Sequence, residues 1–260
     1  MATMIPQKND FDKAQLSERY SKGSVYIVVF ISLLNIILNV NPSKISTIND
    51  IMAVLALLAG VAKFYFQWQF ELSYRQAEET RRNGLIDDSF ETKSANTPSE
   101  GYYDTKDIEH GIKKLLSNIH ENSLFSSKIT YAMFKKTEIR TLIMIGAIFT
   151  IALLNFLGSQ SVVAVVDMFL SLDLLRDYLK LKKLQNDLEN VQTSCKYIWN
   201  HYSSKRGKAE MKTTAEIIRV VIKYETSLAY ASLMFDNNIF RQLNSSITSE
   251  WEEVKKRFCK

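Results

Sequence analysis

The stretch Val25–Val40, VYIVVFISLLNIILNV, contains no charged residue, and a second apolar stretch, Ile51–Phe66, follows it after a short polar turn. The pattern recurs far along the chain, where Thr141–Leu157 and Ser161–Leu175 flank a break at residues 158–160. Apolar stretches of this length, arranged in adjacent pairs, are typical of helical hairpins that cross a membrane. The sequence therefore predicts an all-α membrane protein with two transmembrane hairpins, four spans in total.

The four arms are slightly shorter than the roughly 20 residues that a spanning helix needs. Flanking aromatic side chains that suit the membrane interface, at Tyr65, Trp68 and Tyr178, extend them into range. The alternative is that the arms are four buried helices of a soluble bundle. A mean hydropathy of -0.11 does not decide between the two, because it averages apolar arms with very polar flanks.

The placement of basic residues favours membrane insertion and sets an orientation. Lys and Arg gather at the open ends of both hairpins, whereas the first turn has Lys44 alone and the second has none. Basic residues remain on the cytoplasmic side of a membrane. Both termini and the middle segment should therefore be cytoplasmic, and both turns should face outward.

The expected organisation has five parts, which follow the apolar arms and the breaks between them. Long helices should extend from the membrane into a cytoplasmic helical bundle, with Gly84 ending one of them and residues 84–106 forming a loop. Helices are also expected over 107–123, 213–235 and 238–258. The parts are a cytoplasmic N-terminal helix at 1–24, hairpin 1 at 25–66, a cytoplasmic helical insert at 67–140, hairpin 2 at 141–175 and a cytoplasmic helical tail at 176–260.

Several polar residues interrupt the apolar arms and form a candidate intramembrane polar seam. A polar group in hydrocarbon is costly, so these side chains should face protein or water. They could line a conduit in an assembled oligomer, or they could form hydrogen bonds that hold neighbouring helices together. The seam consists of Ser32, Asn35, Asn39, Asn155 and Asp167.

The last predicted helix carries apolar side chains at alternating steps of three and four, as in a coiled coil. This stripe could pack within the chain, or it could mediate self-association into a homo-oligomer. Its members are Phe240, Leu243, Ile247, Trp251, Val254 and Phe258. Residues 176–260 are also rich in Lys and Arg, which could meet anionic lipid head groups, the more acidic segment 67–140 or a nucleotide.

The sequence offers no catalytic, cofactor-binding or metal-binding pattern. The three histidines have no metal-ligand spacing, and no phosphate-binding glycine loop or nucleophile elbow occurs. Asp87 and Asp88 are expected in a loop as solvated charges rather than as a catalytic pair. We therefore expect a non-enzymatic protein without cofactor or metal that binds no nucleic acid, with the lipid bilayer as its main partner.

The layout resembles the four-transmembrane pore-forming effectors of bacterial anti-phage systems that are associated with nucleotide-second-messenger synthases. The stretches that carry the resemblance are Gln7–Tyr20, Arg81–Phe90, Tyr224–Thr226 and Leu243–Trp251. It implies an effector of the bacterial inner membrane that perturbs or permeabilises the bilayer when its cytoplasmic helices receive a nucleotide signal or a partner protein. The alternative is a non-channel scaffold or sensor subunit that recruits a cytoplasmic partner.

Overall fold

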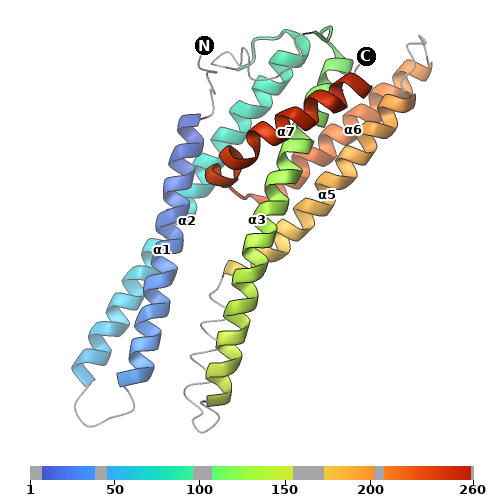
Figure 1. Ribbon diagram of the computed structural model, residues 1–260. Helices are drawn as coiled ribbons and strands as arrows, with labels where there is room; N and C mark the ends of the chain where they lie inside the picture. Colours follow the sequence, from blue (N-terminus) through green and yellow to red (C-terminus); the bar gives the residue numbers. More distant parts are fainter. Residues whose placement is uncertain (1–7, 39–45, 96–106, 155–172, 202–207, 259–260) are drawn as a thin grey trace. The chain divides into compact units, whose positions relative to one another are not determined.

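The computed structural model describes residues 8–38, 46–95, 107–154, 173–201 and 208–258 (Figure 1). These residues form helices and connecting turns without any strand, so the predicted all-α class is confirmed. The helices in the described residues are α1 (Lys8–Leu38), α2 (Ser46–Phe90), α3 (Ile112–Leu154), α5 (Asp173–His201), α6 (Lys208–Ala231) and α7 (Asn237–Phe258).

The chain divides into two compact units, each described here by itself. The apolar unit comprises Asp10–Arg75 and Thr137–Asp177, and therefore contains all four apolar arms. The polar unit comprises Met1–Asn9, Gln76–Lys136 and Tyr178–Lys260. Helices α2 and α3 each have residues in both units, since the divisions fall inside them.

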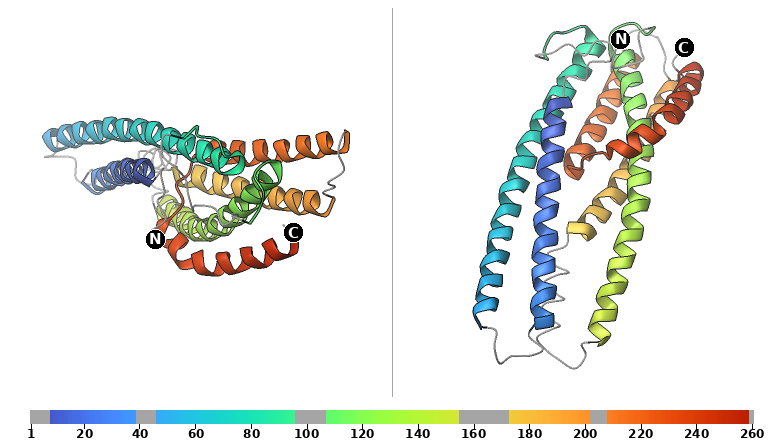
Figure 2. Two further views of the ribbon diagram at one scale, coloured as in Figure 1. Left: turned by 90° about the horizontal axis from the view of Figure 1, so that it is seen from above. Right: turned by 60° about the vertical axis from the view of Figure 1, so that its left-hand side comes forward.

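In the apolar unit, α1 and α2 run alongside each other in opposite directions (Figures 1 and 2). Aromatic rings join them at two levels, with Phe11 6.2 Å from Tyr74 and Tyr20 5.0 Å from Phe66 between ring centroids. Small side chains allow the close approach, because Ala14 is fully buried between these levels. Antiparallel pairing of this kind is what a short connection between two helices produces.

The polar unit has a main hydrophobic core contributed by α2, α3, α5 and α6. Each helix turns an apolar face inward, for example through Leu116, Leu188 and Ile217, all of which are fully buried. Helix α7 packs on α3 through a second, smaller cluster that contains Leu124, Ile129, Ile247 and Trp251. Figure 2 shows α7 beside α3, seen from above.

Helix α2 is longer than expected, because it continues past Gly84 and ends at Phe90. The prediction that residues 84–90 form a loop is wrong. Leu85 is 2 % exposed and Ser89 is fully buried, so packing holds the last turns in the helix despite the glycine. Glu91 follows the helix with a φ of 57°, in the left-handed region, and the N–H of Gly111 donates to the Ser89 carbonyl at 2.7 Å.

The other helix predictions differ from the structure mainly in their limits. Helix α1 joins the predicted N-terminal helix to the first apolar arm, and α3 joins the insert to the third arm without interruption. The start of α3 lies at Ile112 instead of 107, because residues 107–111 form a turn. The expected helices over 213–235 and 238–258 are present as α6 and α7, within a few residues at each end.

One helix in the described residues is long and apolar enough to cross a membrane by length and composition, namely α2 over Asp50–Phe90. Its most apolar 18-residue window has a mean hydropathy of 1.6 and is only 11 % buried. The core helix of a soluble protein would be mostly buried, so the low value separates α2 from that class.

Candidate functional site

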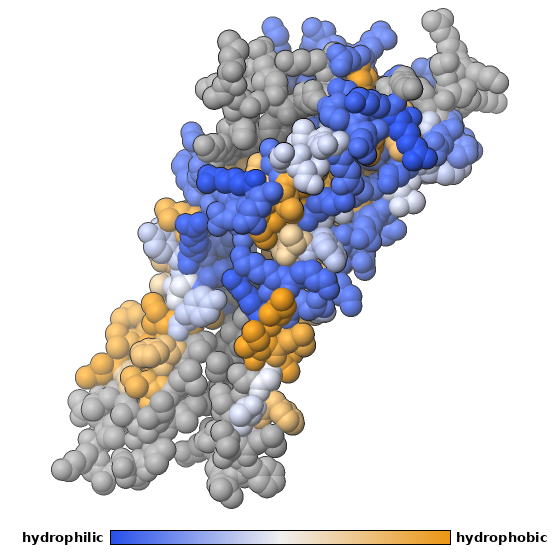
Figure 3. Space-filling view, in the orientation of Figure 1, coloured by the Kyte–Doolittle hydropathy of each residue, from blue (hydrophilic) through white to orange (hydrophobic). Residues whose placement is uncertain are grey.

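Large apolar side chains are exposed along the described parts of α1, α2 and α3 in the apolar unit. Among the most exposed are Phe64 at 77 %, Leu57 at 69 % and Ile143 at 68 %. In Figure 3 orange marks the apolar residues that gather on this unit, and blue covers most of the polar unit. Burying one such side chain is worth about 1.5–3 kcal/mol, so a surface of this extent would be costly in water.

The exposed surface of α2 surrounds most of the helix. From Ile51 to Phe64 the side chains that are more than a third exposed include Val54, Leu57 and Val61, while Met52 and Ala59 are buried. A helix that is apolar on nearly all sides lies either in the core of a large protein or in a membrane. The exposure of this helix fits the second environment.

The candidate polar seam lies largely outside the described residues. Asn39, Asn155 and Asp167 are not described, and Ser32 and Asn35 lie in α1 with side chains that are not described. The choice between a conduit lining and interhelical hydrogen bonds therefore stays a prediction.

The coiled-coil-like stripe lies mostly on the face of α7 that meets the rest of the polar unit. Ile247 and Trp251 are 2 % and 1 % exposed and pack with Leu124 and Ile129 of α3. Leu243 and Val254 border the same cluster, and Phe258 packs on the main core. Phe240 is the member that stays accessible, at 39 % exposed. Packing within one chain thus accounts for most of the stripe, and self-association through Phe240 stays a prediction.

A buried cluster of charged side chains connects α2 to α6 in the polar unit. The Arg81 guanidinium donates through Nη2 to Glu78 Oε2 at 2.9 Å and to Glu225 Oε2 at 2.5 Å. Arg82 donates through Nε to the same Glu225 oxygen at 2.9 Å. Glu78, Arg81, Arg82 and Glu225, which we call the ion cluster, balance each other in charge.

The ion cluster contacts an aromatic side chain of α6. The Arg81 guanidinium lies 5.8 Å from the ring centre of Tyr224, whose hydroxyl is 3.1 Å from Ser126 Oγ on α3. Burial raises the pKa of Tyr224 far above its ordinary value, so the phenol stays protonated. Burial alone would lower the pKa of Arg81, but Glu78 and the other neighbours raise it well above its usual range. Arg81 is therefore a permanent cation, as a buried ion pair requires.

The ion cluster is not fully satisfied. Arg81 Nη1 and Glu225 Oε1 are buried without a hydrogen-bond partner. Side chains of Arg81, Glu78 and Glu225 are only 10 %, 7 % and 15 % exposed. Buried ion pairs contribute little net stability because desolvation opposes the attraction, yet breaking one is costly. The main contribution of such a cluster is therefore to fix the position at which α6 packs on α2 within the polar unit. Its contribution to net stability is small.

A buried histidine lies under α7. His120 of α3 is 1 % exposed, with the rings of Trp251 at 5.6 Å and Phe258 at 6.2 Å. Its Nδ1 is buried without a hydrogen-bond partner. Burial, together with the positive charge of the nearby Lys196, lowers the pKa of His120 to about 4. His120 is thus neutral at physiological pH and acts as part of the hydrophobic packing.

The adjacent carboxylates Asp87 and Asp88 lie in the last helical turns of α2, not in a loop as predicted. Asp87 accepts hydrogen bonds from Thr92 Oγ1 at 2.6 Å and from two backbone N–H groups of the following turn at 2.7 Å. Asp88 accepts from Asn118 at 2.8 Å and pairs with Lys114 at 3.4 Å. Burial opposes ionisation of Asp87 slightly, but these hydrogen bonds lower its pKa. Both carboxylates therefore fix the end of the helix.

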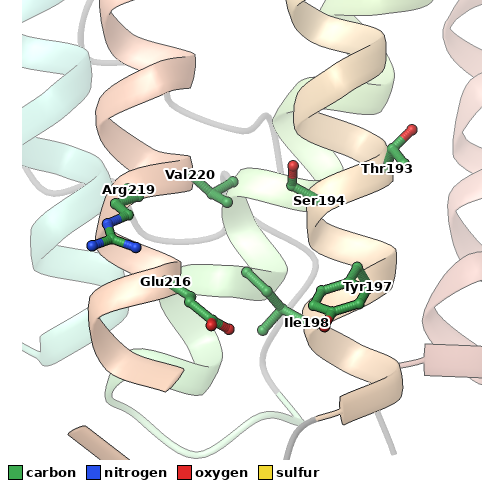
Figure 4. A pocket seen from close by; sticks show the side chains of 7 residues that line it. All are labelled: Thr193, Ser194, Tyr197, Ile198, Glu216, Arg219 and Val220. Carbon is green, nitrogen blue, oxygen red and sulfur yellow. The ribbon is translucent and has the colours of Figure 1, made fainter. Parts of the chain in front are cut away.

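A depression of about 440 Å³ lies between α5 and α6 (Figure 4). Ile198 of α5 and Val220 and Glu216 of α6 point into the space between the helices, whereas Arg219 points away from it. Thr193, Ser194, Tyr197 and Arg219 complete the lining. Glu216 is the only carboxylate among these seven lining residues, and no histidine or cysteine accompanies it, so the lining does not form a recognisable catalytic set. Among the described residues, no group of three or more His, Cys, Asp or Glu is placed to hold a metal ion.

Sequence reasoning missed the ion cluster and the buried histidine. Glu78, Arg81 and Arg82 have the spacing of solvated helix charges, and their partner Glu225 lies more than 140 positions away. No local pattern in the sequence marks Glu225 as buried, and a buried charge finds its partner only in the folded chain.

Comparisons with known proteins do not assign the chain to a family. No protein-family model matches it, and neither the curated proteins nor the solved structures contain a significant match.

The ion cluster gives a testable stability difference. Replacing Glu225→Gln keeps the shape but leaves the buried Arg81 charge with one carboxylate instead of two, and we expect a loss of about 3 kcal/mol in unfolding free energy. The matched control is Asp187→Asn, which breaks the solvent-exposed pair with Lys183 and should change the unfolding free energy much less. Denaturation followed by circular dichroism on purified protein measures both. Equal losses would show that the cluster is not effectively buried.

The buried histidine predicts a pH dependence. The pKa of His120 is lower in the folded state than in the unfolded state, so the unfolded state binds the proton more readily. The free energy of unfolding should therefore be independent of His120 above about pH 6.5 and should fall as the pH drops toward 4. The lowered pKa of His120 corresponds to a loss of about 3 kcal/mol in unfolding free energy once the histidine is protonated in both states. His120→Phe should remove this part of the pH profile, whereas His201→Phe, at an exposed position, should leave the profile unchanged. An identical acid profile for His120→Phe and the parent would contradict the assignment.

Proposed function

We propose that the chain is an integral membrane protein in which the apolar unit lies in the bilayer. The observation that carries this proposal is the exposed apolar surface of α1, α2 and α3, with Phe64 and Leu57 as its most exposed members on α2. Four spans, with both termini and the polar unit on the cytoplasmic side, follow from the apolar arms and from the basic residues at their open ends. The bacterial inner membrane is the location that the resemblance implies.

The proposed activity is a controlled perturbation of that membrane. The polar unit would hold the spans in a resting arrangement and would shift them to a leaky one when a nucleotide signal or a partner protein binds. A ligand can do this only if it binds one arrangement more tightly than the other. Two features support the idea of control: α2 and α3 carry residues of both units, and the part of α2 in the polar unit contributes to the ion cluster. Anti-phage defence is the context that the resemblance implies.

No covalent chemistry is part of the proposal. The polar side chains that the structure brings together, in the ion cluster and around Asp87 and Asp88, hold helices to one another. Assembly into a homo-oligomer belongs to the proposal, because four spans per chain are few for a conduit and the polar seam would line one only between copies.

A second function, a membrane scaffold or sensor, is favoured by the free face of α6. Met211, Ile218 and Ile222 are 73 %, 45 % and 56 % exposed and lie at helical spacing on one side of that helix. Such a face suits an amphipathic partner helix. A stoichiometric partner recovered with the solubilised protein, together with an unchanged membrane conductance, would favour the scaffold over the effector.

The effector proposal predicts loss of membrane potential. Expression in a bacterial host, alone and during phage infection, should depolarise the cells in the infected culture, as followed with a potential-sensitive dye. Leu58→Arg places a charge in the apolar surface at a cost of about 3 kcal/mol for insertion and should abolish the effect. Tyr131→Arg, at an exposed position of the polar unit, is the matched control and should preserve the loss of potential. Resistance to alkaline extraction would show that the parent protein is inserted in the membrane. If infected cells that carry the inserted protein kept a normal membrane potential, the effector role would be contradicted.

A further inference from the structure

Exposed aromatic side chains gather at one level of the α1–α2 pair. Tyr20 of α1 lies 5.0 Å from Phe66 of α2, and Tyr65 lies 5.4 Å from Phe66 and 6.5 Å from Trp68, all between ring centroids. Tyr20, Tyr65 and Trp68 are 52 %, 54 % and 56 % exposed. We call Tyr20, Tyr65, Phe66 and Trp68 the aromatic collar.

The collar differs from ordinary core packing in the same helix pair. Phe70 and Tyr74, one and two turns further along α2, are 4 % and 7 % exposed and pack inward. Tyr20, Tyr65 and Trp68 instead present large rings with a hydroxyl or an indole N–H to the outside, and Phe66 packs between the two tyrosines. Rings of this amphipathic kind are enriched where hydrocarbon meets the lipid head groups.

Polar contacts begin at the level of the collar. Ser21 Oγ donates to Gln67 Oε1 at 3.4 Å across the two helices, and Gln69 donates to the Tyr65 hydroxyl at 3.5 Å. Lys22 pairs with Glu18 at 2.8 Å and with Asp177 at 3.8 Å. In the other direction along both helices the most exposed side chains are mainly apolar, for example Phe64 on α2 and Tyr26 on α1, and the partly exposed Lys63 is the charged residue nearest to the collar on that side of α2.

Helix lengths agree with a membrane boundary at this level. From Ser46 to Trp68, α2 rises about 33 Å at 1.5 Å per residue. From Tyr20 to Leu38, α1 rises about 27 Å by the same measure. The hydrocarbon core of a bilayer is about 30 Å thick. The collar and the far ends of the two helices are therefore separated by one membrane thickness.

We propose that the aromatic collar lies in the head-group layer of the bilayer and fixes the depth of the α1–α2 hairpin. The inference rests on the proposed function, since it requires the apolar unit to be in a membrane. It assigns the Lys22 ion pairs and the Ser21–Gln67 contact to the interface, where charged and polar groups remain hydrated. Residues of α2 from Gln69 onward then lie outside the hydrocarbon.

Spin-label accessibility along α2 tests the assignment. The full chain with Cys195→Ala and Cys259→Ala receives single cysteines at exposed positions, Leu55→Cys, Val61→Cys, Leu72→Cys and Arg75→Cys, in vesicles of phosphatidylcholine and phosphatidylglycerol. Labels at 55 and 61 should be more accessible to oxygen, and labels at 72 and 75 to a water-soluble nickel chelate.

The possible results separate the inference from the proposed function. A change of preference between residues 61 and 72 supports the collar as the boundary. If the protein is inserted but the label at residue 75 is more accessible to oxygen, or the label at residue 61 is more accessible to nickel, the boundary is not at the collar. Either result overturns the inference but is still consistent with membrane insertion. Nickel preference at all four positions overturns insertion itself, and the inference with it.

A variant pair tests whether the collar anchors the hairpin or only marks the boundary. Tyr65→Leu with Trp68→Leu keeps an apolar side chain at both positions and removes the phenol hydroxyl and the indole N–H, so the label at residue 72 should gain oxygen accessibility as the helix sinks. Tyr131→Leu, at an exposed position of the polar unit, is the control and should leave that label unchanged. No shift in the double variant would overturn the anchoring role.

Discussion

Between Ile51 and Phe64, helix α2 presents apolar side chains in almost every direction, and only small or inward positions such as Ala59 are covered by protein. In water each exposed side chain forgoes about 1.5–3 kcal/mol relative to burial. Marginally stable proteins do not tolerate many such losses at once, because their total stability is only about 5–15 kcal/mol. A hydrocarbon environment removes this cost. The other features of the apolar unit depend on this constraint.

The polar unit obeys a different constraint, since its helices bury charges as well as apolar side chains. The ion cluster joins α2 to α6, and its four charges cancel, but two of its atoms are left without partners. Close-packed apolar side chains would have held the two helices with less desolvation cost. What the charges provide is a particular docking position, because a slide of one helix along the other would separate Glu225 from Arg81 and Arg82 and leave the buried Arg81 with Glu78 alone. A docking contact of this kind is suited to a switch between discrete arrangements.

The helical class and most helix positions could be predicted from the sequence because the signals are local. The spacing of Leu115, Leu116 and Ile119, for example, appears within one helix, and all three of these residues are buried. The end of α2 was misplaced at Gly84, since the helix there depends on burial of Leu85 against residues distant in sequence. The ion cluster and His120 were missed for the same reason. Their environments arise from helices that meet only in the folded chain. The sequence itself does not show whether a charged or titratable side chain is buried or solvated.

The central claim is that the exposed face of α2 meets lipid. A photoactivatable apolar probe dissolved in the bilayer, followed by mapping of the labelled residues, measures this directly on the full chain in vesicles. The account predicts that label appears at Leu57, Leu58, Val61 and Phe64 and is weak at the buried Met52 and Ala59. Absence of label from all of residues 51–64, or equal label at buried and exposed positions, would contradict it.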